Sequence, residues 1–391
     1  MINITKLLCG LNSYGDILRY NPAVTGERKP VVVWNSTKRC NLSCVHCYAD
    51  SSRNRYPGEL STGEAKEMLK DIAGMKAPVV LFSGGEPLTR PDIFELIAFS
   101  KSLGLRAVLS TNGTLITHEA AKKLKSSGLD YAGISLDGIG VNNDKFRART
   151  GAFSAALSGI RNLQKAGQKA GLRFTLTKGN YHDLEGIFNL AEKEGIERVC
   201  FYHLVYSGRA ARMKIADLSH SQTRQCVDSI CSWVTSLHAR GLHKEVLTVD
   251  NHADSVYIYL KVKKENPEKA AGVFDLLRLN GGNSSGEGIA NVDNLGFVYP
   301  DQFWHEHCLG NVRERKFSGI WSDGSLELRE QLRNRKNHFK GRCLRCRYLE
   351  LCNGNFRARA EAVSGDMWED DPACYLTDEE VLGGKYAISG L

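Results

Sequence analysis

Long apolar segments are missing from this sequence. No hydrophobic run approaches the roughly 20 residues that a membrane-spanning helix needs, which excludes a membrane protein. The opening segment MINITKLLCG has neither an extended apolar stretch nor a small-residue cleavage site, so we expect no export signal. These absences predict a protein of the cytoplasm that has no membrane partner.

Clustered charge of one sign is also scarce. The chain has 52 basic and 44 acidic residues, a net charge of +8, but no block of basic residues interleaved with aromatic ones. A nucleic-acid partner is therefore not expected, and most cations are expected on a solvated surface. The modest positive excess still suits a small polyanionic ligand.

Cysteine, by contrast, is abundant. Twelve cysteines without a secretory signal argue against a disulfide scaffold and favour metal sites in a reducing compartment. Thiolates and iron–sulfur clusters oxidise readily, so the cytoplasm of an organism that lives with little oxygen fits best.

Short β-branched runs alternate with helical patterns through the first half of the chain. The expected strands are Val31–Asn35, Val79–Phe82, Arg106–Ser110, Tyr131–Ser135, Arg173–Leu176 and Arg198–His203. Apolar residues at helical spacing lie between them, for example in Thr62–Gly74, Pro91–Leu103 and Leu184–Glu194. Parallel strands need crossover helices, so this alternation predicts an α/β protein with a parallel sheet.

At 391 residues the chain is too long for one core, and four regions are expected. They are a leader (1–30), the α/β core (31–206), a mainly helical linker (207–285) and a small cysteine-rich unit with its tail (286–391). The linker helices are expected at Ser219–Arg240, His252–Glu265 and Glu268–Leu279. A hairpin is expected over Ile289–Tyr299, because the turn residues Asp293-Asn294-Leu295-Gly296 divide it.

Cys40, Cys44 and Cys47 stand in the spacing C-x3-C-x2-C directly behind the first expected strand. Electron-transfer clusters normally give every iron a cysteine, so three thiolates leave one iron of a four-iron cluster open to a small molecule. The alternative is a tetrahedral zinc site completed by His46.

The cysteine motif and four later segments resemble the radical S-adenosylmethionine (SAM) superfamily. Those segments are Gly84-Gly85-Glu86-Pro87, Ser110-Thr111-Asn112-Gly113, Ser135-Leu136-Asp137-Gly138 and Asp144-x2-Arg147-x3-Gly151-x-Phe153. The resemblance implies a partial (β/α)6 TIM-type barrel, open on one side, whose three cysteines hold a 4Fe-4S cluster. It also implies SAM contacts from Gly84, Gly85, Glu86, Asn112, Ser135, Arg147 and His46. Reductive cleavage of SAM would then give a 5′-deoxyadenosyl radical that abstracts hydrogen from the substrate.

A second cysteine group, Cys343-x2-Cys346-x5-Cys352-x21-Cys374, follows near the end of the chain. It resembles the auxiliary-cluster half of a SPASM or twitch domain, which implies a second 4Fe-4S cluster; structural zinc is the alternative. Phe356 and Asp301 stand where relatives carry further cysteines, so one auxiliary cluster is expected. Cys308 is isolated, and Cys9, Cys200, Cys226 and Cys231 are expected to be small core residues.

The segments TLTKGNYHDL, YSGRA and DNLGFVYPDQFWHEHCLGNVRERKF, with the Ser13–Asn21 region, resemble a tetrapyrrole-modifying branch of the superfamily. That branch contains the 12,18-didecarboxysirohaem deacetylase of the alternative haem pathway and a related enzyme of haem d1 synthesis that acts on propionates. The N-terminal leader and the segment RERKF favour the deacetylase, which yields Fe-coproporphyrin III, and the haem d1 enzyme is the alternative. The resemblance implies an iron tetrapyrrole substrate, which loses two acetate groups in the deacetylase, and a donor such as ferredoxin or flavodoxin.

Such substrates carry many carboxylates around a flat ring, so cations and aromatic faces are wanted. The candidate substrate contacts are Arg209, Arg212, Lys214, Arg313 and Arg315 for carboxylates, and His305 and His307 for the iron. Two rival interpretations stay open. One is a peptide-modifying SPASM maturase, although only 30 residues precede the first strand; the other is a non-enzymatic zinc or iron–sulfur module.

Overall fold

A computed structural model of the chain describes residues 1–13, 15–20 and 28–383. Parts of the expected leader, of the Ser13–Asn21 region and of the C-terminal tail lie outside these residues. Eleven strands form one sheet in the order β1-β8-β7-β6-β5-β4-β3-β2-β9-β10-β11. They are β1 (Ile2–Asn3), β2 (Val31–Asn35), β3 (Val79–Ser83), β4 (Arg106–Thr111), β5 (Tyr131–Ser135), β6 (Ala170–Leu176), β7 (Arg198–His203), β8 (Glu245–Val249), β9 (Ile289–Val292), β10 (Phe297–Tyr299) and β11 (Gly310–Asn311).

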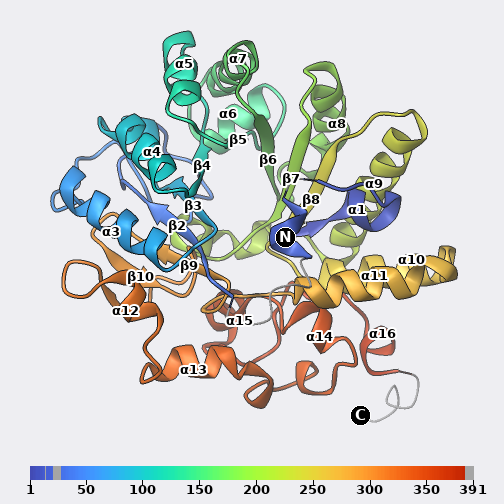
Figure 1. The fold of residues 1–391 in the computed structure, drawn as a ribbon. Helices are drawn as coiled ribbons and strands as arrows, with labels where there is room; N and C mark the ends of the chain where they lie inside the picture. Colours follow the sequence, from blue (N-terminus) through green and yellow to red (C-terminus); the bar gives the residue numbers. More distant parts are fainter. Residues whose placement is uncertain (14, 21–27, 384–391) are drawn as a thin grey trace.

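The strands from β2 to β8 are parallel and consecutive, as expected when each crossover is helical. Figure 1 shows that they curve into an incomplete ring, with helices on the outside and the C-terminal elements below the opening. The helices of the ring are α3 (Thr62–Gly74), α4 (Ile93–Ser102), α5 (His118–Ser126), α6 (Val141–Arg147), α7 (Ala152–Lys165), α8 (Leu184–Lys193) and α9 (His220–Ala239). The fold is therefore a partial barrel, as predicted, with the seven parallel strands β2 to β8 where six were expected.

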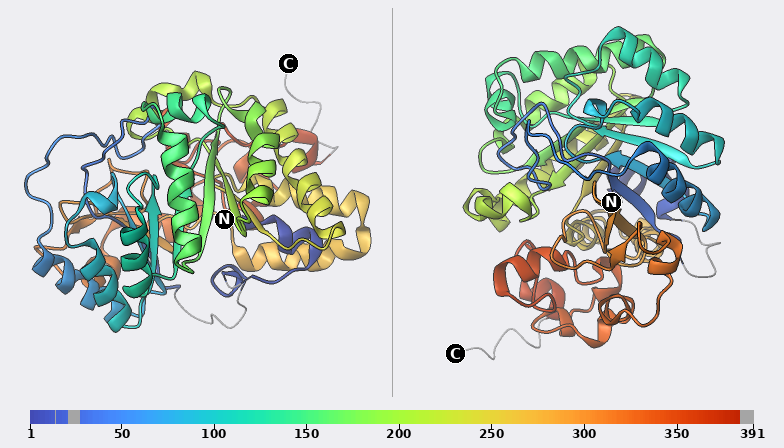
Figure 2. Two further views of the ribbon diagram at one scale, coloured as in Figure 1. Left: turned by 90° about the horizontal axis from the view of Figure 1, so that it is seen from above. Right: turned by 90° about the vertical axis from the view of Figure 1, so that its left-hand side faces the viewer.

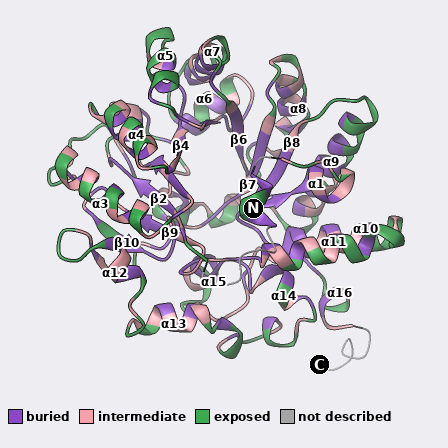
Figure 3. Ribbon diagram, in the orientation of Figure 1, coloured by how far each residue is buried: buried purple, intermediate pink, exposed green. Residues whose placement is uncertain are grey.

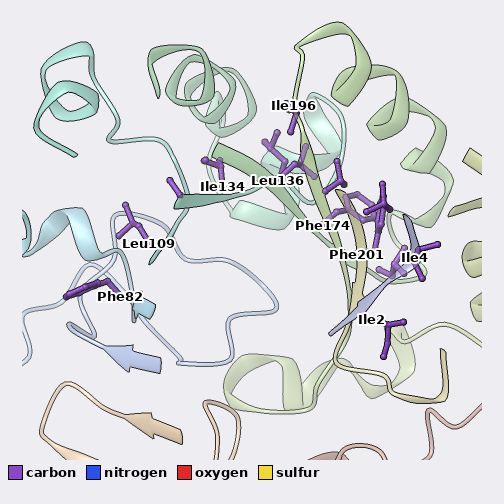
Figure 4. Close-up of a cluster of buried hydrophobic side chains, with 14 of the residues drawn as sticks. Ile2, Ile4, Phe82, Leu109, Ile134, Leu136, Phe174, Ile196 and Phe201 are labelled. Atoms are coloured by element: carbon purple, nitrogen blue, oxygen red, sulfur yellow. The ribbon is translucent and has the colours of Figure 1, made fainter. Parts of the chain in front are cut away.

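Alternate strand residues point out of the ring and pack beneath the helices. Phe82, Leu109, Ile134, Phe174 and Phe201 are fully buried and belong to one apolar cluster, part of which Figure 4 draws. Figure 3 shows the exposed residues on the outer faces of the helices. The outward residues thus bind helices to the sheet, which leaves the inward residues for other chemistry.

The six predicted strands are all present, and all six predicted helices lie within two residues of the observed bounds. Among them, α11 (Pro267–Asn280) covers the predicted Glu268–Leu279. One feature of the region 207–285 was not predicted: besides α9, α10 (Ala253–Glu265) and α11, it contains β8, which pairs with β7. The barrel sheet therefore continues beyond residue 206 into the expected linker.

The predicted hairpin is confirmed, because β9 and β10 pair antiparallel around the 293–296 turn. The structure adds that β9 also pairs in parallel with β2, which extends the barrel sheet into the C-terminal region. At the other edge, β1 pairs antiparallel with β8. Two short helices of the leader, α1 (Ile4–Cys9) and α2 (Asp16–Arg19), lie beside this edge.

The C-terminal region consists of short helices joined by loops. They are α12 (Phe317–Trp321), α13 (Glu327–Arg333), α14 (Leu349–Cys352), α15 (Arg357–Ser364) and α16 (Asp378–Leu382). The right-hand view of Figure 2 shows this region stacked against the barrel. None of the helices that the structure describes is long and apolar enough to cross a membrane.

Candidate active site

A cavity of about 760 Å³ occupies the inside of the barrel and extends to the C-terminal region. Its size falls in the range of ligand pockets. Its wall includes all three cysteines of the first motif, the glycines of the second segment and inward residues of the strands, together with Phe303 and Phe356 from the C-terminal region. One continuous cavity therefore joins the predicted SAM site to the barrel interior.

Cys40, Cys44 and Cys47 lie on the loop that follows β2, the first two buried and the third partly buried. The segment after β7 holds this cysteine loop through Arg209. The Arg209 backbone N–H donates to the Cys47 carbonyl at 2.9 Å, and the Arg209 side-chain Nε donates to the Cys44 carbonyl at 2.8 Å. Gly208 has φ +55°, and a Cβ there would lie 2.3 Å from the Tyr48 carbonyl oxygen. The cysteine loop is thus held in place by contacts from the segment after β7.

The glycines 84 and 85 meet protein backbone at close range. Gly84 has φ +129°, and a Cβ there would lie 2.3 Å from the Thr37 carbonyl oxygen. A Cβ at Gly85 would lie 2.2 Å from the Arg39 carbonyl oxygen. Both glycines line the cavity. They are needed for this approach to the cysteine loop, whatever they contribute to a ligand.

The structure does not bring the Glu86 carboxylate to the cavity wall. Glu86 is fully buried and accepts from the Asn112 backbone N–H and the Thr111 hydroxyl, both at 2.8 Å, and from the Leu88 N–H at 3.2 Å. Burial raises the pKa of Glu86 to about 7, against the effect of these hydrogen bonds. The residue ties the loop after β3 to the loop after β4.

Arg147 lies at the end of α6, beside the cysteines. Its guanidinium donates to Cys44 Sγ at 3.6 Å and forms an ion pair with Asp137, which also lies 3.1 Å from His46 Nε2. Burial alone would raise the pKa of Asp137, but the charges of Arg147 and His46 lower it below its usual range. Nδ1 of His46 and Nε of Arg147 are buried and have no hydrogen-bond partner, so each side chain has one unsatisfied polar atom.

Asn112 and Ser135 also line the cavity, at the ends of β4 and β5. The Asn112 amide nitrogen lies 3.9 Å from Cys40 Sγ and donates to Asn41 Oδ1 at 2.8 Å. Together with the cysteines, His46 and Arg147, these residues form one continuous wall at the carboxyl ends of the strands. The structure therefore brings together every predicted SAM residue except the Glu86 side chain.

This wall fits a 4Fe-4S cluster with SAM better than a zinc ion. Within the described residues, no three His, Cys, Asp or Glu side chains could hold one metal ion. A tetrahedral zinc site with bonds of about 2.3 Å needs its sulfurs about 4 Å apart, whereas thiolates around a cube bind different irons and lie farther apart.

The second cysteine group gathers in the C-terminal region. Cys343 and Cys352 are buried, Cys346 and Cys374 partly so, and the four thiols are close enough to influence one another. Burial raises the pKa of Cys352 to about 12 and that of Cys374 to about 11. Neutral thiols are therefore favoured without a metal, which would have to displace their protons.

The candidate substrate contacts do not lie where they were expected. Arg209 fastens the cysteine loop, Arg212 is exposed, and none of the seven candidates lines the cavity. The reason is local pairing: Arg313 binds Glu64 at 2.6 Å, Arg315 binds Asp323 at 2.6 Å, His307 binds Glu361 at 2.9 Å, His305 packs on Tyr299, and Lys214 donates to the Ala362 carbonyl.

Several cavity residues were not singled out from the sequence. They are Tyr48, Asp137, Arg173, Tyr202, Asp250 and His252. Arg173 and Tyr202 stand at inward positions of strands β6 and β7, where polar residues interrupt otherwise apolar strands. Period-two alternation is the signal that points to them.

Comparisons with known proteins agree with this geometry. The model of the Radical SAM superfamily matches residues 34–191. Fe-coproporphyrin III synthase of Methanosarcina barkeri is 55% identical over 97% of this chain and 99% of its own length. Pre-heme d1 synthase of Dinoroseobacter shibae is 42% identical over 95% of this chain and 93% of its own length.

Among solved structures, SuiB of Streptococcus suis bound to S-adenosylmethionine matches with a TM-score of 0.70. The match covers 90% of this chain and 78% of SuiB at 16% identity, which supports the fold alone.

Proposed function

The chain belongs to the radical SAM superfamily, and on that premise we propose that it removes the two acetate side chains of 12,18-didecarboxysirohaem to yield Fe-coproporphyrin III. The observation that carries the proposal is the 55% identity to Fe-coproporphyrin III synthase across nearly the whole of both chains. The large cavity of about 760 Å³ supports it, since a tetrapyrrole needs a wide, flat space beside SAM.

Cys40, Cys44 and Cys47 would hold the 4Fe-4S cluster, and the wall beside them would hold SAM. When bound, this pair supplies a 5′-deoxyadenosyl radical that takes hydrogen from an unactivated C–H bond. The residues of the chain bind and orient: Arg147 is suited to the methionine carboxylate because a guanidinium fork matches it. His46, Asn112, Ser135 and the backbone of Gly84–Gly85 complete the contacts.

The Glu86 side chain has a positioning role in this proposal. It holds the Asn112 backbone N–H at 2.8 Å and so fixes the loop that carries the Asn112 amide. Its full burial also separates it from water, which keeps this loop contact strong.

Cys343, Cys346, Cys352 and Cys374 would hold an auxiliary 4Fe-4S cluster with four protein ligands. Such a closed site suits structure and electron relay. The reductant is proposed to be a low-potential carrier such as ferredoxin or flavodoxin.

The test is an anaerobic incubation of the reconstituted protein with SAM, dithionite and 12,18-didecarboxysirohaem, followed by mass analysis of the macrocycle. Loss of both acetates, together with formation of 5′-deoxyadenosine, is the expected result. The triple variant C40A/C44A/C47A is the control, and it should form neither product.

Two outcomes would change the assignment. Conversion at propionate side chains would identify the activity of pre-heme d1 synthase instead. An unaltered macrocycle, while SAM is still cleaved, would overturn the tetrapyrrole proposal but leave the cluster assignment standing.

A further inference from the structure

The inner face of the barrel carries polar side chains below the predicted SAM wall. Arg173 on β6 lines the cavity two residues before Thr175, whose backbone N–H donates to Asp137 at 2.7 Å. Strands rise about 3.3 Å per residue, so Arg173 lies roughly 7 Å deeper than Thr175 along the strand. It therefore stands between the SAM wall and the floor of the barrel.

The Arg173 guanidinium has few partners of its own. Its Nη1 donates to the Ser110 hydroxyl at 2.5 Å, and the group lies 6.0 Å from the centre of the Tyr202 ring. Its Nε is buried and makes no hydrogen bond. No carboxylate within the described part of the chain forms an ion pair with Arg173. Burying a cation without a negative partner costs free energy.

Three other arginines at the cavity form ion pairs with carboxylates. Arg147 pairs with Asp137, while Arg198 and Arg19 share Glu245 at 3.3 Å and 2.9 Å. Arg173 thus differs from these neighbours in having no anionic side chain beside it.

Glycines on the adjacent strands make room for this arrangement. A Cβ at Gly133 would lie 2.2 Å from Arg173 Nε, and a Cβ at Gly171 would lie 2.2 Å from the Tyr131 hydroxyl. Gly133 and Ser135 of β5 stand beside β6, with Ser135 opposite Arg173 in the register. The missing side chain at 133 lets the guanidinium lie across the sheet and face the cavity.

We propose that Arg173 binds a carboxylate side chain of the iron tetrapyrrole substrate and so fixes the macrocycle below SAM. This inference rests on the proposed function and deepens it. A carboxylate would supply the missing negative charge and accept from the guanidinium, while the Tyr202 ring offers an aromatic face to the macrocycle. Arg147 remains beside the cysteines for SAM, so the two guanidinium groups serve different ligands.

The experiment titrates Fe-coproporphyrin III, which carries four carboxylates, into the full-length, cluster-loaded protein under anaerobic conditions with SAM present. The dissociation constant is read from the Soret absorbance. The variant Arg173→Gln is expected to weaken binding about 10- to 100-fold, as loss of a charge-assisted hydrogen bond does. The conservative variant Arg173→Lys should recover part of this loss.

Two controls match these variants. Arg161→Gln removes an exposed arginine of α7 that does not line the cavity and should leave binding within about twofold. The tetramethyl ester of Fe-coproporphyrin III should bind wild type and Arg173→Gln equally, because it presents no carboxylate. Gly133→Ala keeps the charge but crowds the guanidinium, and it should also weaken binding of the acid.

The outcomes separate the two proposals. Failure of the wild type to bind any iron tetrapyrrole would contradict the proposed function itself. Tight binding by the wild type with an unchanged dissociation constant in both Arg173 variants would overturn this inference. A weaker affinity for SAM, with tetrapyrrole binding unchanged, would overturn it too and assign the guanidinium to SAM.

Discussion

Asp250 is a titratable residue of the cavity wall with a rare backbone conformation. It follows β8 with φ +67°, a conformation that non-glycine residues rarely adopt, although Asn and Asp tolerate it best. Its carboxyl group is 6% exposed, and burial raises its pKa from 3.8 to about 7, with a further contribution from Asp301. The folded protein therefore prefers the neutral acid at this position.

The sign of the pH dependence follows from that preference. A carboxyl with a raised pKa binds its proton more tightly in the folded state, so stability falls as pH rises from about 4 to about 7. We expect Asp250→Asn to be more stable than wild type at pH 8 and so to unfold at a higher temperature. The gain in free energy of unfolding should be on the order of 4 kcal/mol at most. The difference should shrink as pH is lowered toward 5.

Thermal unfolding followed by circular dichroism at several pH values measures this. Asp250→Ala is the matched control, because it also lacks the titrating group but tolerates positive φ poorly. It should lose the same pH dependence yet be less stable than Asp250→Asn at every pH. An equal pH dependence in wild type and Asp250→Asn would contradict the prediction.

For single residues, the sequence identifies metal ligands that recur at a fixed spacing. It does not identify residues whose role depends on where their side chains point in the fold. Cys40, Cys44 and Cys47 were found because thiols at that spacing have few other uses. Arg173 was not found from the sequence. Its proposed role depends on a side chain that points into the barrel and on the space left by Gly133 on the neighbouring strand. The substrate cations chosen from the sequence do not line the cavity, and some pair with surface carboxylates, as Arg313 does with Glu64.

Among the elements, the segment 207–209 after β7 forms hydrogen bonds with the cysteine loop after β2, although the two are far apart in the sequence. Arg209 makes two further hydrogen bonds there, to Asp50 Oδ1 at 2.9 Å and to the Ser51 carbonyl at 2.8 Å. With its bonds to the Cys44 and Cys47 carbonyls, Arg209 holds the second half of the motif and the residues that follow it. The segment after β7 is therefore part of the support of the first cluster.

We expect Arg209→Ala to reduce retention of the first cluster, because the cysteine loop loses the three hydrogen bonds that the Arg209 side chain donates to it. Rates of iron release to a chelator should rise several-fold, while the far-UV circular dichroism stays unchanged. Arg212→Ala, which removes an exposed neighbour, is the control and should release iron at the wild-type rate. Identical release from both variants would show that the loop holds without Arg209.

The elements themselves were largely predictable from local pattern. Strands β2 and β7 match their predicted bounds, because β-branched runs there are bounded by turn residues. Strand β8 was missed although Glu245–Val249 is rich in β-branched residues, since it follows a long helix and lies in a region expected to be helical. The pairing of β9 with β2 is separated by more than 250 residues, and no local pattern encodes such a contact.

For the whole molecule, the junction of barrel and C-terminal region depends on buried polar contacts. Arg359 is fully buried and forms a two-pronged ion pair with Asp371 at 2.8 Å and 2.9 Å. Its Nη1 donates to the Leu204 carbonyl, just after β7, at 2.9 Å. Asn355 contributes a second link through the backbone N–H of His252 at 2.7 Å.

We expect Arg359→Met to destabilise the protein by about 3–5 kcal/mol, because Asp371 is left as an unpaired buried charge. Chemical denaturation monitored by tryptophan fluorescence measures the change. The double variant Arg359→Met/Asp371→Asn removes both charges and should recover part of the loss. A double variant less stable than the single one would show that the ion pair is not the source of the effect.

The C-terminal region has few apolar elements of its own, so its fold should depend on its four cysteines. Small units with little core usually need a metal to stay folded. We expect Cys343→Ala/Cys346→Ala to lose about half of the iron and to speed hydrogen exchange in α14 and α15, while β3 to β6 remain protected. The first cluster should survive, because its ligands and supports lie in the barrel and in the loop 207–209. Fast exchange throughout the barrel would mean instead that the two regions fold as one cooperative unit, whereas unchanged exchange in α14 and α15 would show that packing alone holds the C-terminal region.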